Sequence, residues 1–76
     1  MSRRLPALKP RQVIRALEGA DFLIHHVAGS HYALRHRQRL DLRVTVAYHN
    51  RDLHPKTLRS IIRQAGLTVD EFIDLL

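Results

Sequence analysis

The stretch FLIHHVAGSHYALRH, residues 22–36, decides the fold of this chain, because its hydrophobic period is that of a strand rather than a helix. Apolar and polar residues alternate on both sides of Gly29, and β-branched and aromatic residues are frequent, as is typical of half-buried strands. A second alternating run, RLDLRVTVAYH, follows at residues 39–49. Together these runs predict three successive strands of an antiparallel sheet.

The turns between the strands determine which side chains share a face of the sheet. Gly29 ends the segment VAG, and the last position of a three-residue hairpin loop needs the positive φ that glycine adopts readily. We therefore expect residue 26 to pair with residue 30, and residue 36 to pair with residue 40 across a second turn at residues 37–39. The apolar face then carries Phe22, Ile24, Tyr32, Leu34, Leu42, Val44 and Val46. The opposite, open face carries Leu23, His25, His31, Ala33, Arg35, Arg43, Thr45, Ala47 and His49.

Three helices flank the predicted strands. Pro10 and Pro55 each suit the first position of a helix, and Thr68 with Glu71 forms a capping box. The predicted helices span residues 10–18, 55–65 and 69–75. The order of elements predicts an α+β fold, in which a three-stranded antiparallel sheet is covered on one face by the two longer helices and a short helix ends the chain.

Length and composition limit the class of protein. A chain of 76 residues is expected to form one domain, residues 1–76, and without cysteine it has neither disulfides nor a thiolate zinc site. Its apolar runs are too short to span a bilayer, and the start MSRRLPALKP lacks the apolar segment of a signal peptide. We therefore expect no membrane association and a cytoplasmic location.

Positive charge is the strongest functional signal. Thirteen Lys and Arg residues against seven Asp and Glu give a net charge of +6, and eleven of the thirteen are arginine, which suits bidentate contacts to phosphate. Arg35, Arg37, Arg39 and Arg43 are expected around one hairpin beside His31, where they would form a track for the phosphates of RNA. The alternative interpretation is a basic surface that meets an acidic protein or only aids solubility.

Several segments together resemble the HicA family of toxin–antitoxin ribonucleases. They are GSHYAL at residues 29–34, VAYHN at residues 46–50 and HPKTLRSIIRQAGLTVDEFIDLL at residues 54–76, and the resemblance extends from about Lys9 to Leu76. It implies a fold like that of double-stranded-RNA-binding domains, and the activity of a small endoribonuclease that cuts mRNA and arrests translation. It also implies neutralisation by a partner antitoxin, HicB. The histidine of the Gly-Ser-His triplet is taken as catalytic in this family, which implies that role for His31 and a structural turn for Gly29.

A histidine suits RNA cleavage without a metal, because its unperturbed pKa of about 6.5 lets it accept or donate a proton near neutral pH. Arg35 and Arg43 would hold the phosphate. As a second catalytic group, His49 ranks ahead of His25, whereas Tyr32 is more simply explained as part of the core. Ser30 is a candidate to orient His31, although a serine bonded to its own turn is the commoner case.

Other readings remain open at this point. His26 and His36 are expected toward the helix side or an edge of the sheet. The chain has six histidines but no helical His pair and no carboxylate at ligand spacing, so we expect neither a metal nor another cofactor. The main alternative function is a non-catalytic RNA-binding module, which would not need His31. If the protein is a toxin, a HicB-like antitoxin should cover the open face around His31 and Arg35.

Overall fold

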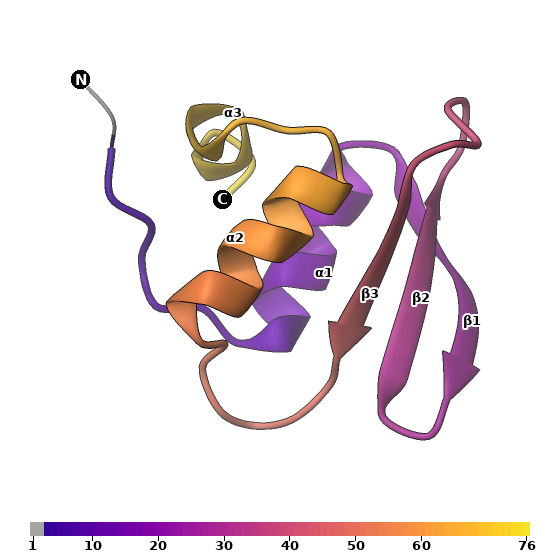
Figure 1. Ribbon diagram of the computed structural model, residues 1–76, viewed down its shortest axis with the longest axis horizontal. Coiled ribbons are helices and arrows are strands. Elements are labelled where there is room, and N and C mark those ends of the chain that lie inside the picture. Colours follow the sequence, from indigo (N-terminus) through magenta and orange to yellow (C-terminus); the bar gives the residue numbers. More distant parts are fainter. Residues whose placement is uncertain (1–2) are drawn as a thin grey trace.

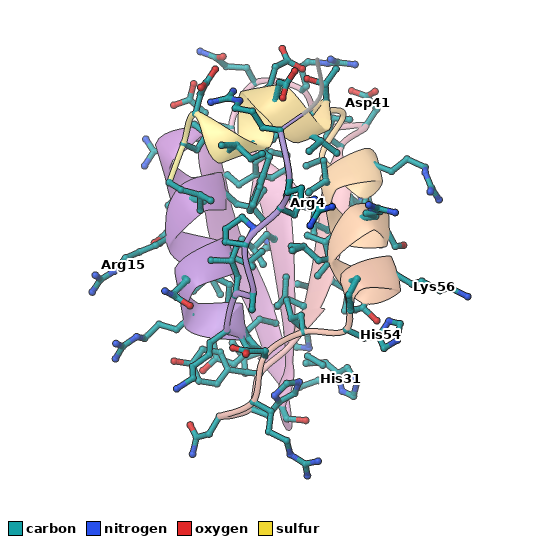
Figure 2. The ribbon with its side chains drawn as sticks, turned by 90° about the vertical axis from the view of Figure 1, so that its left-hand side faces the viewer. Arg4, Arg15, His31, Asp41, His54 and Lys56 are labelled. Atoms are coloured by element: carbon teal, nitrogen blue, oxygen red, sulfur yellow. The ribbon has the colours of Figure 1, made fainter. Side chains whose placement is uncertain are left out.

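The computed structural model describes residues 3–76, and its layers are those that the sequence predicts (Figure 1). The elements follow in the order α1 (Pro10–Gly19), β1 (Phe22–Ala28), β2 (His31–His36), β3 (Arg43–Ala47), α2 (Pro55–Gln64) and α3 (Val69–Ile73). The strands form one antiparallel sheet in the order β1-β2-β3. Helices α1 and α2 lie side by side on one face of this sheet, which confirms the α+β fold (Figures 1 and 2).

The core fills the space between the sheet and the helices. Val13 and Leu17 of α1 and Phe72 of α3 are completely buried. Their partners on the sheet are Leu34, Val44 and Val46, each at most 1 % exposed. Burying a side chain of this size stabilises the fold by about 1.5–3 kcal/mol. Removal of these apolar surfaces from water therefore fixes which face of the sheet stays open.

The starts of α2 and α3 are stabilised by side-chain caps. The predicted capping box of α3 is confirmed: the Thr68 N–H donates to Glu71 Oε1 at 2.8 Å, and the Glu71 N–H donates to Thr68 Oγ1 at 3.1 Å. At α2 the cap is His54, whose Nδ1 accepts a hydrogen bond from the Lys56 N–H at 3.1 Å. Each cap satisfies a backbone donor that has no partner within the helix.

The first turn differs from the expectation. Ala28 pairs with His31 around the two residues Gly29 and Ser30, so the predicted pairing of residues 26 and 30 was wrong. Gly29 does have the expected positive φ, +58°, but as the first residue of a two-residue turn. A register change by one residue would turn the apolar side chains of β1 to the other face.

A β-bulge in β1 prevents that inversion. Ile24 pairs with Leu34, and His26 pairs with Ala33, the residue next to Leu34 in β2. His25 is therefore an extra, unpaired residue of β1. Beyond the bulge, Phe22 faces the helices and is only 2 % exposed, as predicted. Ile24, also expected on the apolar face, is 40 % exposed.

The second turn is longer than predicted. Arg35 pairs with Arg43, and the His36 N–H donates to the Leu42 carbonyl at 3.3 Å, so the predicted pairing of residues 36 and 40 was wrong. The shift is two residues, an even number, and each side chain of β3 therefore keeps its predicted face. His36 Nδ1 accepts from the N–H groups of Gln38 and Arg39 at 3.1 and 3.0 Å, which makes it a turn residue.

The connections gather at two opposite ends of the molecule (Figure 1). At the lower end in this view lie the β1–β2 turn, the β3–α2 loop and the starts of α1 and α2; at the upper end lie the β2–β3 loop and α3. The Tyr48 N–H donates to the Ser30 carbonyl at 2.7 Å, which joins the β3–α2 loop to the β1–β2 turn. Within residues 3–76, no helix is both long and apolar enough to cross a membrane.

Candidate functional site

The candidate site is the open face of the sheet, on the side away from α1 and α2. Alternation along β2 and β3 and the two registers define which side chains share it. The face carries Leu23, His26, Ala28, His31, Ala33, Arg35, Arg43, Thr45 and Ala47. It holds imidazole and guanidinium groups and no carboxylate.

His31 is the first residue of β2 and is exposed. Its cross-strand neighbours are Ala28 on β1 and Ala47 on β3, two small side chains that leave the imidazole accessible from both sides. Its ring makes no hydrogen bond to any of residues 3–76. The backbone at His31 is therefore held by the sheet, while both ring nitrogens are free to contact a ligand.

Ser30 holds the turn through its backbone. The contact it makes is that of its carbonyl with the Tyr48 N–H, whereas its hydroxyl has no hydrogen-bond partner among residues 3–76. The ring of Tyr48 stacks on that of Tyr32, with centroids 4.7 Å apart and planes 23° apart. Tyr32 is half-buried in this stack and packs against the core, as predicted.

His49 lies beyond the end of β3, in the β3–α2 loop. It was expected on the open face because side chains alternate along a strand, but this alternation does not continue into the loop. Its Nδ1 accepts the Arg51 N–H at 3.1 Å, and in the neutral ring Nε2 then carries the hydrogen. His49 also lines two surface hollows, one with Lys9 and Arg11 at the start of α1 and one with His54 at the start of α2. It is arranged as a hydrogen-bond donor.

The four arginines of the expected phosphate track do gather at the β2–β3 hairpin, but not beside His31. Arg35 lies four residues further along β2, a distance of about 13 Å at the usual rise of a strand. Figure 2 shows His31 near one end of the molecule and Asp41, in the β2–β3 loop, at the other. Arg37 and Arg39 belong to that loop.

The charges at this hairpin are poorly compensated. Arg35 and Arg43 are directly opposite each other across the two strands, an arrangement that is destabilising for like charges. Neither forms an ion pair with an acidic residue among residues 3–76. Arg39 approaches Asp41 at 3.4 Å, but both side chains are exposed, so that pair adds little stability. The side chains are thus arranged to attract an anion.

Sequence reasoning missed one part of the site, the hollow beside the bulge. His25, His26, Arg35 and Arg43 line it together with Ala33, Leu34, Val44 and Thr45. His26 was expected toward the helix side or an edge; it is exposed on the open face, because the bulge reverses the alternation at this point. With Gly29-Ser30 recognised as a two-residue turn, regular alternation would have put the apolar side chains of β1 on the open face. The need for a bulge would then have been evident.

Metal binding has no structural support in the described part of the chain. No group of three or more His, Asp or Glu side chains within residues 3–76 is placed to hold an ion. The open face carries imidazole, guanidinium and hydroxyl groups.

The fold and the open face define a small α+β protein with a basic, histidine-bearing sheet surface. The family model described as the HicA toxin of bacterial toxin–antitoxin systems matches residues 10–67, from the start of α1 through α2. The chain belongs to this toxin family. No curated protein matches it.

Proposed function

We propose that this toxin is a metal-independent endoribonuclease that cleaves mRNA, with His31 as its general base or acid. The observation that carries the proposal is the setting of His31. Its backbone is fixed at the start of β2, its ring is exposed, and both cross-strand neighbours are alanines. A ribose and its phosphate can therefore approach the imidazole without a clash.

The reaction follows from the chemistry of RNA. The imidazole of His31 takes the proton of a ribose 2′-OH, and the 2′-oxygen attacks the adjacent phosphorus to form a 2′,3′-cyclic phosphate. The bond to the 5′-oxygen of the next nucleotide breaks on the opposite side of the phosphorus, and that oxygen takes a proton from a second group, for which His49 is the first candidate. Such a positioned acid–base group contributes about 10²- to 10⁴-fold to the rate.

His49 and Ser30 are the proposed accessory groups. His49 follows Tyr48, whose N–H bonds the carbonyl of Ser30, so the two candidates lie at the same end of the sheet as His31. The hydrogen bond from Arg51 leaves Nε2 of neutral His49 as a donor, which suits stabilisation of charge on a phosphate oxygen. The free hydroxyl of Ser30 is available to orient His31 or the substrate.

The partner of the toxin family is an antitoxin, and we propose a HicB-like protein that covers the open face around His31 and Arg35. A partner in that position excludes RNA from both ends of the face at once. We place the activity in the cytoplasm, where mRNA is translated. The basic charge of the face favours an antitoxin that presents carboxylates to it.

Cleavage of a labelled single-stranded RNA in EDTA tests the enzymatic proposal. Wild-type protein should yield products ending in a 2′,3′-cyclic phosphate, and His31→Ala should lower the rate by about 100-fold or more. Arg15→Ala is the control, because Arg15 projects from α1 (Figure 2), and α1 covers the face of the sheet opposite to the one that carries His31. Cleavage by His31→Ala at the wild-type rate would refute the role of His31.

A non-catalytic RNA-binding module is the second candidate function. The observation in its favour is that no side chain among residues 3–76 hydrogen-bonds to His31 and orients it. In the same experiment, this function predicts that neither wild type nor His31→Ala cuts the RNA, while both bind it with equal affinity.

A further inference from the structure

The hollow beside the β-bulge is distinct from the surroundings of His31. It has a volume of about 410 Å³ and is lined by two histidines from β1 and by one arginine each from β2 and β3. The bulge places both His25 and His26 at its rim, whereas regular alternation would turn one of them to the opposite face. Bulges often re-aim side chains next to functional sites in this way.

Its charge is uncompensated within the described chain. Arg35 and Arg43 lie directly opposite each other, neither has an acidic partner among residues 3–76, and no Asp or Glu lines the hollow. Like charges in opposite strand positions reduce stability, so the fold gains nothing from this pair. An anion bound between the two guanidinium groups would remove the repulsion and accept hydrogen bonds from both.

The hollow and His31 lie along one line on the open face. His31, Ala33 and Arg35 alternate on this side of β2, so a single small side chain separates the two positions. The distance from His31 to Arg35 is about 13 Å. Phosphates of a stacked nucleic-acid strand rise by about 3.4 Å per nucleotide, so the interval corresponds to about four stacked nucleotides, or fewer in an extended strand.

We propose that this hollow is a second phosphate-binding site, which holds the backbone of the RNA strand a few nucleotides away from the phosphate that is cut. Arg35 and Arg43 make the main contacts, and the imidazoles of His25 and His26 and the hydroxyl of Thr45 add hydrogen bonds. A substrate must then be long enough to reach from His31 to the hollow. The inference rests on the proposed function, which places the cut at His31.

An RNA strand fits this surface better than an acidic protein does. A nucleic-acid backbone carries one negative charge per nucleotide at regular intervals, so one strand can occupy both positions, with nothing larger than Ala33 between them. Carboxylates of a protein have no such fixed spacing.

Phosphate interference tests the second site. The substrate is an oligonucleotide of about 12 nucleotides, a typical length for a single-strand site, with one ribonucleotide as the only cleavable position and 2′-O-methyl nucleotides elsewhere. A neutral methylphosphonate replaces one phosphate at a time, and KM and kcat for cleavage are measured in EDTA. A replacement two to four nucleotides from the cut should raise KM by about tenfold with little change in kcat.

The double variant Arg35→Gln/Arg43→Gln assigns this effect to the hollow. It should raise KM for the unmodified RNA by about tenfold, and the distant methylphosphonate should then cause no further increase. The matched control is Arg59→Gln/Arg63→Gln, which removes the same charge from α2 and should keep the full interference. The second site would be overturned by interference at the cleaved phosphate alone, or by an equal loss of the distant interference in both double variants.

Two further outcomes separate the alternatives. If none of the proteins cuts RNA, the proposed function fails. The hollow is then still tested by measuring Kd, in place of KM, for each RNA with a methylphosphonate replacement. If polyglutamate binds with the same dependence on Arg35 and Arg43 as RNA and no distant phosphate interferes, the hollow is a docking site for an acidic protein and the inference is wrong.

Discussion

The two ends of the open face are built in opposite ways. Around His31 the cross-strand neighbours are alanines, and a hydrogen-bonded turn fixes the backbone. At the bulge, by contrast, Arg35 and Arg43 oppose each other, and two further histidines line the same hollow. The difference indicates a division between a position that leaves space for chemistry and a position that concentrates charge for binding.

The division has an energetic cost at one end only. Alanine in a strand is a weak but harmless choice, whereas facing arginines oppose folding by about 0.2–1 kcal/mol. A small protein has few kcal/mol to spare, so an uncompensated repulsion is better explained by a ligand than by packing. The basic end is therefore where substrate affinity should reside, and the His31 end is where the rate should be determined.

A carboxylate placed between the two ends of the open face should weaken RNA binding most strongly. Ala33 lies between His31 and Arg35 on the open face, so Ala33→Glu puts a negative charge where the RNA strand passes. We expect the Kd for RNA to rise about 10- to 100-fold in a titration at low salt. Ala33→Gln, similar in size but neutral, is the control, and an equal loss of affinity in both variants would argue against a strand along this path.

The turn before His31 should show the next largest effect. Gly29 has φ +58°, and a Cβ added there would meet no atom within 4 Å, so Gly29→Ala incurs only the backbone cost of that conformation. We expect a loss of about 1–2 kcal/mol in the free energy of unfolding, measured by urea denaturation. Gly29→Asn should lose less, because asparagine tolerates this conformation. Equal stability of all three proteins would mean that the turn relaxes freely.

The smallest effect should have the opposite sign. Arg43→Gln removes the repulsion with Arg35 and should raise the free energy of unfolding by about 0.2–1 kcal/mol. Arg63→Gln makes the same chemical change in the last turn of α2, where a cation is favourable, and should lower it by about 0.3–1 kcal/mol. Thermal denaturation of the two variants at low salt compares them directly. A lower stability of Arg43→Gln would show that Arg43 is a structural residue.

Local sequence signals were sufficient for much of the fold. The capping box of Thr68 and Glu71 and the prolines at the helix starts predicted the helices within a few residues. The faces of Leu34, Val44 and Val46 were also correct, because an even register shift leaves alternation unchanged. These features depend on neighbours in the chain or on a period of two.

The site was less predictable, because it depends on register. A glycine suits both two-residue and three-residue turns, so Gly29 alone could not distinguish them. The choice between them decides whether β1 needs a bulge, and therefore where His26 points. The length of the second turn likewise moved Arg43 from the expected position opposite Ala33 to one opposite Arg35, two residues further from His31. The Nδ1 contacts of His36, His49 and His54 to nearby N–H groups also had no recognised sequence signature.

The most direct test compares how the two ends affect cleavage. We would measure kcat and KM for a single-stranded RNA in EDTA with wild type, His31→Ala and Arg35→Gln/Arg43→Gln. His31→Ala should lower kcat by about 100-fold or more and leave KM within about twofold, whereas the double arginine variant should raise KM by about tenfold and leave kcat nearly unchanged. Changes in kcat and KM that are the same for both proteins would contradict the division of the open face into a catalytic end and a binding end.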